Sequence, residues 1–405
     1  MHKSTLFTGQ PIFAQLLGLI PQTLINKFTR KYNSDRYCKK FMSYDHFVTM
    51  LYASFFQCAS LREVTTGMQA NVFKLQHLGL EHTPRRSTLS EANQRRSADW
   101  FGDLYHALYD LYFGGLPDSR RKEDRLFIID STTISLFSSI MQGAGSYKSN
   151  GKKKGGAKAH VMLDAHHDIP AFIDISEAKE HDLTFLNKLQ VPDGAIVVMD
   201  KAYVKHSQFE EWDSRGVRWV TRQKDDASVQ IIERLDVPEE AAQGGVLEDN
   251  IILLGRPSNK KVTPVLRVRQ VVYLDKNTNN AYIFITNDFT STAQQIADIY
   301  KQRWQIELLF KRIKRCYPLK YFLGDNPNAV KIQIWSALIC DLLIRIVQQQ
   351  VKTKQNKSWA YATLSGMIRH HLMQYLHLTE FLRNPEKALL NYKPPDNALQ
   401  LKMFG

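Results

Sequence analysis

Four polar residues between positions 300 and 314 have the types and the spacing that chemistry requires. They are Tyr300, Arg303, Glu307 and Lys314. An α-helix turns by about 100° per residue, so on one helix these side chains would share a strip about 60° wide. A carboxylate among cations suits a site that holds a metal ion and binds phosphate. The alternative is the solvated charged face of an ordinary amphipathic helix.

The helix that carries this strip is expected to run from about residue 292 to residue 316, because Pro318 follows it. Apolar residues fill the sector beside the strip, so one face of the helix would pack on a core. These apolar residues are Ile299, Ile306, Leu309, Phe310 and Ile313.

Two further acids follow short apolar runs. Residues 126–129 precede Asp130, and residues 195–199 precede Asp200. Continuous apolar runs of this length are typical of strands buried on both faces, and ligands bind at the carboxyl ends of such strands. We therefore expect Asp130, Asp200 and Glu307 to converge. Three carboxylates can hold two divalent cations about 3.5–4 Å apart, and oxygen ligands favour Mg²⁺ or Mn²⁺ over zinc.

Each acid taken alone has a structural explanation. An aspartate before serine and threonine can simply end a strand or cap a helix. Asp164 and Asp174 also lie near expected strand ends. The run 166–168 (His-His-Asp) resembles a metal cluster, but its place before Pro170 predicts a polar turn. The metal-site hypothesis therefore depends on all three acids meeting in the fold.

The chain of 405 residues is basic, with 54 Lys and Arg against 40 Asp and Glu. Residues 1–100 hold 13 bases against 6 acids, residues 148–158 hold five lysines and no acid, and residues 300–320 hold seven bases and one acid. Clustered positive charge indicates a polyanionic partner such as nucleic acid. The alternative is a basic protein whose charge serves solubility alone.

Cysteine usage and hydropathy bound the compartment. None of the four cysteines forms a CxxC pair, which argues against a zinc site and a disulfide framework. The most apolar late stretch, residues 335–347, contains Asp341 and Arg345 and is too short to span a bilayer. The N-terminus has no clean signal-peptide hydrophobic region. We therefore expect a cytoplasmic protein with no membrane partner.

Changes of pattern divide the chain into five segments. Residues 1–115 are expected to be helical, and residues 120–222 alternate short strands with helices. Residues 223–288 are β-rich and interrupt this α/β pattern. Residues 289–345 return to helix and carry the polar strip, and residues 346–405 form a C-terminal helical region. This order predicts an α/β core with a β-rich insertion, between helical N-terminal and C-terminal regions.

A basic turn in the N-terminal segment is a candidate phosphate contact. Arg85 and Arg86 follow Pro84 and precede a helix start with Ser87 near its cap. Cap hydroxyls and the free amides of a first turn can hold a phosphate, as in a helix-turn-helix module on the DNA backbone. A plain helical bundle with a solvated arginine pair is the alternative.

The spacing Tyr300-x2-Arg303-x3-Glu307-x6-Lys314 resembles the YREK signature of the insertion sequence four family of DDE transposases. Four residue types at three fixed gaps make this resemblance specific.

Other segments extend the resemblance. Residues 129–132 (Ile-Asp-Ser-Thr) resemble the first-aspartate strand of that family, and residues 198–203 (Val-Met-Asp-Lys-Ala-Tyr) resemble the second. Residues 155–160 look like the strand that follows the basic turn of the family. In all, the resemblance covers residues 125 to about 345. Residues 1–100 look like the helical N-terminal domain of one branch.

The resemblance implies an RNase H-like catalytic core, with the β-rich insertion between the second aspartate and the glutamate. It also implies that Asp130, Asp200 and Glu307 are the catalytic metal ligands, for Mg²⁺ with Mn²⁺ as a substitute.

The resemblance also implies that Tyr300, Arg303 and Lys314 hold the DNA strand near the cleaved end. In several members an aromatic residue of the insertion stacks on a flipped base, and Tyr282 is the nearest candidate here.

The leading hypothesis is a transposase that moves an insertion sequence by cut-and-paste transposition. It would bind terminal inverted repeats in double-stranded DNA, cleave them with Mg²⁺ through a hairpin, and transfer the strand to target DNA. By analogy with the family it would act as a homodimer at the nucleoid. The alternatives are a catalytically decayed DNA-binding repressor and an RNase H-like nuclease without strand transfer.

Overall fold

The computed structural model describes residues 10–114, 125–135, 156–177, 182–255, 265–317, 319 and 321–390. The chain divides into two compact units, one made of residues 1–115 with 313–405 and the other of residues 116–312. The lysines at 148 and 152–154 lie outside the described residues.

The described part of residues 116–312 contains a nine-stranded sheet. The strands are β1 (Leu126–Ser135), β2 (Gly156–Asp164), β3 (Ile169–Glu177), β4 (Ile196–Met199), β5 (Arg218–Arg222), β6 (Val229–Leu235), β7 (Val246–Leu254), β8 (Leu266–Asp275) and β9 (Asn280–Thr286). The helices are α8 (Asp182–Leu186), α9 (His206–Ser214), α10 (Glu239–Gly244), α11 (Ala293–Lys301) and α12 (Trp304–Cys316), the last of which crosses into the other unit.

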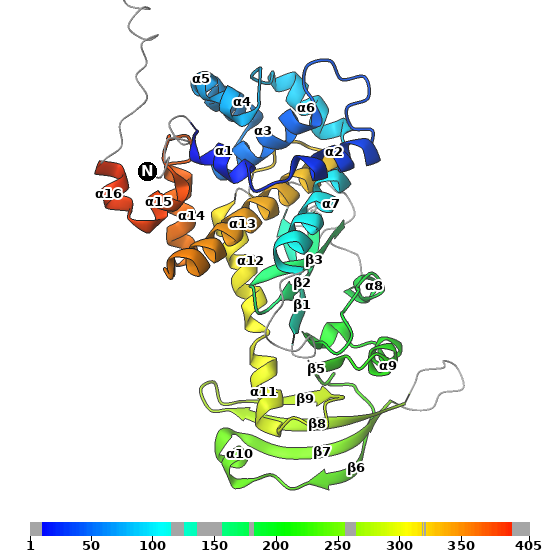
Figure 1. The fold of residues 1–405 in the computed structure, drawn as a ribbon. Helices are drawn as coiled ribbons and strands as arrows, with labels where there is room; N and C mark the ends of the chain where they lie inside the picture. Colours follow the sequence, from blue (N-terminus) through cyan, green and yellow to red (C-terminus); the bar gives the residue numbers. More distant parts are fainter. Residues whose placement is uncertain are drawn as a thin grey trace, which may run out of the picture. The chain divides into compact units, whose positions relative to one another are not determined.

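The strand order is β3-β2-β1-β4-β5-β9-β8-β7-β6 (Figure 1). In the first five strands, β1 is antiparallel to β2 and β2 to β3, whereas β4 is parallel to β1 and β5 to β4. This order and polarity are those of an RNase H-like core, so the expected α/β fold class is confirmed.

The β-rich insertion extends the same sheet. β9 pairs antiparallel with β5, with Thr221 opposite Ile285, and β8, β7 and β6 follow outward. An open edge on β5 would leave backbone N–H and C=O groups without partners, and β9 covers that edge. The segment expected as an insertion is therefore β-rich, as predicted, and is continuous with the core.

Alternating side chains give the core sheet two buried faces. On one face, Trp219 of β5 stacks on Phe209 of α9 with ring centroids 3.9 Å apart. On the other face, Val198 of β4 and Val220 of β5 pack with residues of α11. Burial on both faces is the reason that these strands are continuous apolar runs in the sequence.

The helix expected over residues 292–316 is broken in two, which corrects that expectation. Gln302 and Arg303 form a turn between α11 and α12. In this turn the N–H of Gln302 donates to the carbonyl of Ile299 (3.1 Å), and the N–H of Arg303 donates to that of Tyr300 (3.0 Å). Neither glycine nor proline stands there, so the residue types did not signal the break. The polar strip therefore does not lie on one straight helix.

The other unit is helical in its described residues. Its helices are α1 (Ile12–Leu17), α2 (Gln22–Lys31), α3 (Ser43–Phe55), α4 (Leu61–Ala70), α5 (Val72–Leu75), α6 (Arg86–Arg95), α7 (Ala98–Tyr109), α13 (Pro327–Gln355), α14 (Tyr361–His370), α15 (Leu378–Arg383) and α16 (Pro385–Leu390).

Helices from both parts of the sequence share one core in this unit, although separate N-terminal and C-terminal regions were expected. The long helix α13 crosses the boundary expected at residues 345 and 346, and it packs on α3 and α7. The backbone N–H of Phe13 donates to the carbonyl of Leu372 (2.8 Å), which ties α1 to the segment after α14. The physical reason is that α13 is apolar around most of its surface and needs helices on several sides.

None of the helices among the described residues combines the length and the hydrophobicity needed to cross a bilayer.

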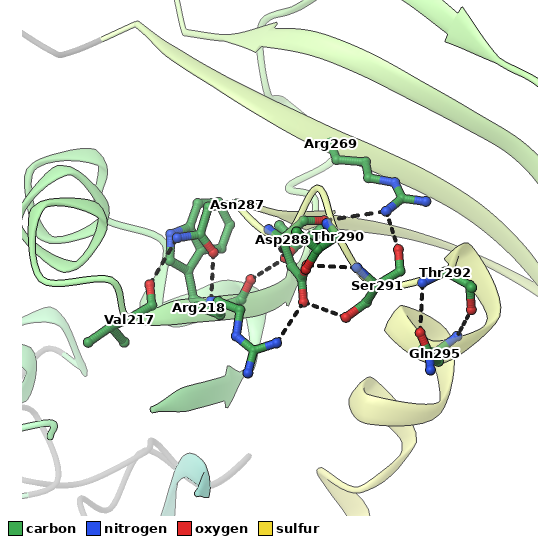
Figure 2. Close-up of polar contacts among 11 residues, drawn as sticks. Val217, Arg218, Arg269, Asn287, Asp288, Thr290, Ser291, Thr292 and Gln295 are labelled. Carbon is green, nitrogen blue, oxygen red and sulfur yellow. Dashed lines mark hydrogen bonds and ion pairs between the residues drawn. The ribbon is translucent and has the colours of Figure 1, made fainter. Parts of the chain in front are cut away.

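The turn from β9 into α11 is built around Asp288 (Figure 2). One carboxylate oxygen accepts hydrogen bonds from the N–H groups of Thr290 and Ser291, both at 2.9 Å. The other oxygen accepts from the Ser291 hydroxyl at 2.6 Å and pairs with Arg218 at 3.4 Å. The buried Arg269 donates to the carbonyl of Ser291. Because α11 starts here and α12 follows it, this turn helps to position the helices that carry the polar strip.

We expect Asp288→Asn to destabilise residues 116–312 by about 2 kcal/mol at pH 7. Burial by itself would raise the pKa of Asp288, but hydrogen bonds from Ser291 and Thr290 lower it from 3.8 to about 2. A folded-state pKa below the unfolded value stabilises the fold above about pH 4, and this contribution is lost as pH falls toward 2. Urea unfolding followed by tryptophan fluorescence should show a difference from wild type that narrows at pH 3.

The exposed Asp236, changed to Asn, is the matched control and should alter stability by less than about 0.5 kcal/mol. Equal losses in the two variants would contradict the role of the Asp288 turn.

Candidate active site

Asp130 lies in β1, and Asp200 directly follows the neighbouring strand β4. β1 and β4 are parallel with Ile129 opposite Met199, so the acid that follows each of these residues stands at the same level. β4 ends at Met199 as expected, whereas β1 continues to Ser135, so Asp130 lies within its strand and not at its end. By the two-residue alternation, both acids are on the sheet face that α11 covers.

Arg303 joins the acid on β1 to the acid on α12. Its Nη1 lies 3.0 Å from Asp130 Oδ2, and its Nη2 lies 2.6 Å from Glu307 Oε1. The side chains of Arg303 and Asp130 are 19% and 20% exposed, so this pair is largely shielded from bulk water, whereas the Glu307 side chain is 36% exposed. The fold therefore brings Asp130 and Glu307 to one guanidinium, although they are far apart in the sequence.

Asp200 is paired with Arg222, a residue that the sequence analysis did not single out. Met199 of β4 is opposite Thr221 of β5, so Arg222 stands at the same level as the two aspartates. Arg222 Nη2 lies 2.9 Å from Asp200 Oδ2. The available signal was a basic residue at the end of a buried strand, because the ends of adjacent parallel strands meet on one side of the sheet.

Two of the predicted DNA-binding residues, Tyr300 of α11 and Tyr282 of β9, lie in the packed layer between α11 and the sheet. Tyr300 is only 8% exposed, and its ring packs against Phe284 with centroids 4.6 Å apart. Tyr282, half-buried on β9, stacks on Phe284 at 6.1 Å. Burial raises the pKa of Tyr300, against the opposing effect of Arg222 and Arg303, so its hydroxyl stays protonated at neutral pH.

The other three predicted DNA-binding residues belong to the helical unit. Lys314 lies on α12, seven residues after Glu307, and burial lowers its pKa. Arg85 and Arg86 are exposed at the start of α6. The expected hydroxyl cap is wrong: Arg85 occupies the N-cap with no side-chain cap, and Ser87 lies in the first turn. A cap needs the residue before the first turn, and α6 begins two positions too early for Ser87 to be that residue.

The pKa of Asp130 is affected by the charges of the other two acids. Burial is the main cause that raises the pKa of Asp130 to about 6. The Ser131 N–H and Arg303 act in the opposite direction, whereas the charges of Asp200 and Glu307 raise the pKa further. Like charges that perturb a partly buried carboxyl are typical of functional sites.

The competing acids have structural partners, as the alternative explanation predicted. The His-His-Asp run forms a turn, in which Asp168 pairs with Arg312. Asp164 is buried and accepts hydrogen bonds from Arg125 (3.0 Å) and His167 (3.1 Å). Although burial alone would raise it, these two partners hold the pKa of Asp164 well below its usual range.

Each candidate metal ligand is paired with an arginine. Among the described residues, no group of three or more Cys, His, Asp or Glu side chains is arranged to hold a metal ion. The pairs Arg303–Asp130, Arg303–Glu307 and Arg222–Asp200 place guanidinium charge where a cation would neutralise the acids. The oxygen-only donor set fits Mg²⁺ or Mn²⁺ once the guanidinium groups move aside.

Comparison with known proteins assigns the family. A model described as the transposase DDE domain matches residues 121–343, and a model described as a domain of unknown function (DUF4372) matches residues 8–81. A putative transposase (y4zB) of Sinorhizobium fredii is 32% identical over 267 residues, which are 65% of this chain and 72% of the relative. The probable transposase for insertion sequence element IS5377 of Geobacillus stearothermophilus is 26% identical, over 58% of this chain and 60% of its own.

A solved structure of the piggyBac transposase synaptic complex with hairpin DNA aligns with 97% of this chain and 82% of that chain. The sequence identity is 10% and the TM-score 0.43, which is a distant likeness.

The match to the transposase DDE domain, on an RNase H-like sheet, places the chain in the class of metal-dependent enzymes that cut and join DNA. This chain belongs to the transposase DDE domain family, and it is a DNA transposase similar to those of insertion sequences.

We expect Arg303→Met to bind Mn²⁺ about tenfold more tightly than the wild-type protein. The substitution removes a positive charge that competes for Asp130 and Glu307, and at an effective dielectric of about 20 a nearby charge is worth at least about 1.4 kcal/mol. Electron paramagnetic resonance of unbound Mn²⁺ at neutral pH measures the affinity without any DNA.

The matched control is Arg312→Met, because Arg312 pairs with Asp168 and not with the candidate ligands. An unchanged or weaker affinity in Arg303→Met would show that the guanidinium does not compete with the ion.

Proposed function

We propose that this transposase moves its insertion sequence by cut-and-paste transposition. It binds the terminal inverted repeats of the element in double-stranded DNA, cleaves them with Mg²⁺, passes through a hairpin and transfers the strand to target DNA. It works in the cytoplasm at the nucleoid, as a homodimer that holds two element ends.

One observation carries this proposal: each of the three acids pairs with an arginine. Arg303 contacts both Asp130 and Glu307, and Asp200, paired with Arg222, directly follows the strand next to that of Asp130. Acids and arginines paired in this way, on inner strands of an RNase H-like sheet, support phosphodiester chemistry more strongly than a structural role. Purely structural acids, such as Asp164, are closed off by their own partners.

In the proposed mechanism Asp130, Asp200 and Glu307 hold the divalent ions. Such ions, when bound there, would supply a lower pKa for an attacking water or 3′-hydroxyl and charge stabilisation at the leaving oxygen. The chain's own part is to present three carboxylates from a rigid sheet and a helix that follows a fixed turn. Mn²⁺ can substitute for Mg²⁺, because both accept oxygen ligands.

The arginines have a second role in this proposal. Once released from the acids, the planar guanidinium of Arg303 binds phosphate oxygens bidentately near the cleaved end, and Arg222 acts beside it. Lys314 adds a point charge for the same strand. Tyr300 keeps its proton and supports Arg303 from the packed layer, and Tyr282 stacks on a flipped base.

We expect Asp130→Ala and Glu307→Ala to reduce cleavage of the element's end DNA to background while end binding persists. Each substitution removes a ligand of the ions and leaves the helical unit unchanged. A labelled duplex that carries the terminal repeat, incubated with Mg²⁺ and resolved on a denaturing gel, measures cleavage, and fluorescence anisotropy measures binding. Asp174→Ala is the control, since Asp174 lies on β3 and pairs with Lys188 (2.6 Å) instead of an active-site arginine.

Cleavage by either active-site variant at the wild-type rate would make the assignment of these acids wrong. The same assay with a target plasmid separates the alternative functions. A decayed repressor would bind the ends without cutting, and a nuclease would cut without joining strands to the plasmid.

A further inference from the structure

The outer face of α6 carries side chains that can read DNA bases. The helix buries Leu89, Ala92 and Asn93 and turns its opposite face to solvent. That face is formed by exposed Arg86, Ser87, Glu91, Gln94 and Arg95 and by partly exposed Thr88 and Ser90. Arginine, glutamine, serine and glutamate are the residue types that hydrogen-bond to base edges in the major groove.

α6 is held rigidly on the helices beneath it. Asn93 Oδ1 lies 2.7 Å from His46 Nε2 of α3, and both side chains are buried. The side-chain amide of Asn328, on α13, donates to the carbonyls of Asn93 (2.8 Å) and Arg96 (2.7 Å) at the end of α6. Burial lowers the pKa of His46 to about 3, so this anchor stays neutral at physiological pH. A recognition element needs such rigid support.

A hollow lies on each side of α6, and each is lined by cations together with Glu91, which pairs with Arg95 at 2.7 Å. The first hollow, of about 750 Å³, lies toward the start of α4 and is lined by Arg62, Arg86 and serine hydroxyls. The second, of about 510 Å³, lies toward the loop before α3 and is lined by Lys39, Lys40 and Arg95. A helix inserted into the major groove is flanked by two phosphate ridges about 12 Å apart. In each hollow the cations outnumber the one acid, Glu91, so two hollows on either side of one helix fit the shape and charge of those ridges.

The loop beside the second hollow is fixed to α6 by one buried arginine. Arg96, the residue after α6, is 8% exposed. It donates to the carbonyls of Ser34 (3.4 Å) and Phe41, and it pairs with Asp35 at 3.8 Å. The cationic loop therefore keeps a set position relative to the helix face.

The same loop displays an aromatic side chain to solvent. Tyr37 is 82% exposed and has a φ of 64°, in the left-handed region that tyrosine seldom adopts. Arg36 lies over its ring at 4.9 Å. An exposed aromatic ring among cations is unfavourable for a bare surface and is suited to nucleic acid.

We propose that α6 is the base-reading helix of this transposase. Its outer face enters the major groove of the terminal repeat, with Ser90 and Gln94 contacting base edges. Arg62 on one side, and Lys39 and Lys40 on the other, bind the flanking phosphates. This inference rests on the proposed function, because it takes the terminal repeat as the DNA that is read.

The test measures sequence preference apart from affinity. Fluorescence anisotropy of the full-length protein compares a labelled duplex of the terminal repeat with a shuffled duplex of the same composition. We expect the double variant Ser90→Ala with Gln94→Ala to bind the repeat about 10- to 100-fold more weakly, because side-chain contacts to base edges are lost. Its binding to the shuffled duplex should stay within about twofold of wild type.

The loop variant Lys39→Ala with Lys40→Ala should behave differently. It should weaken binding to both duplexes by a similar factor and reduce the slope of log affinity against log salt by about 2, because two phosphate contacts are lost. The double variant Thr66→Ala with Gln69→Ala, on the exposed face of α4, is the control and should match wild type. Thermal melting checks that every variant is folded.

Two results would overturn the inference. One is a wild-type ratio of repeat to shuffled binding in the Ser90 and Gln94 variant, and the other is a wild-type protein with no preference for the repeat. Failure of the proposed function looks different. A protein that prefers the repeat through α6 but never cleaves it would refute the transposition proposal and support the base-reading helix.

Discussion

The parallel pairing of β1 with β4 is the constraint on which the candidate active site depends. It places Ile129 opposite Met199, so that Asp130 and Asp200 stand together, and the pairing of β4 with β5 adds Arg222 to the same row. A shift of one residue would turn every side chain of a strand to the other face. The register is fixed because both faces of these strands are buried. One face packs with residues of α8 and α9, and the other packs with residues of α11.

Charge balance follows from that row of residues. Acids gathered in a partly buried place repel one another, and this repulsion contributes to the raised pKa of Asp130. Arg303 and Arg222 compensate the charge in the protein without metal. The same guanidinium groups are suited to phosphate, so metal binding and DNA binding would draw on one set of charges. This links the two events physically, because an arginine on a phosphate leaves its carboxylate open to a cation.

The helical unit holds α6 in place, with one face of the helix buried and its polar face exposed. Its core is shared by helices from both ends of the chain, with α13 packed on α3 and α7. Buried polar contacts, such as those of Asn93 and Arg96, orient α6 and the loop beside it. Contacts from α3 and α13 therefore hold α6 in place, as the proposed recognition of DNA requires.

The sequence by itself determined the local features. Apolar runs indicated the buried strands, and the change of pattern indicated the β-rich insertion. Residue spacing singled out the acids and Arg303. These features are predictable because the periods of strands and helices depend on residues that are close in the sequence. Only the tertiary structure decided the rest. It joined the insertion to the core sheet, broke the helix at Gln302 and Arg303, paired Arg222 with Asp200 and united the terminal helices. These features arise from strand edges, faces and packing partners that are distant in the chain, and no local pattern encodes them.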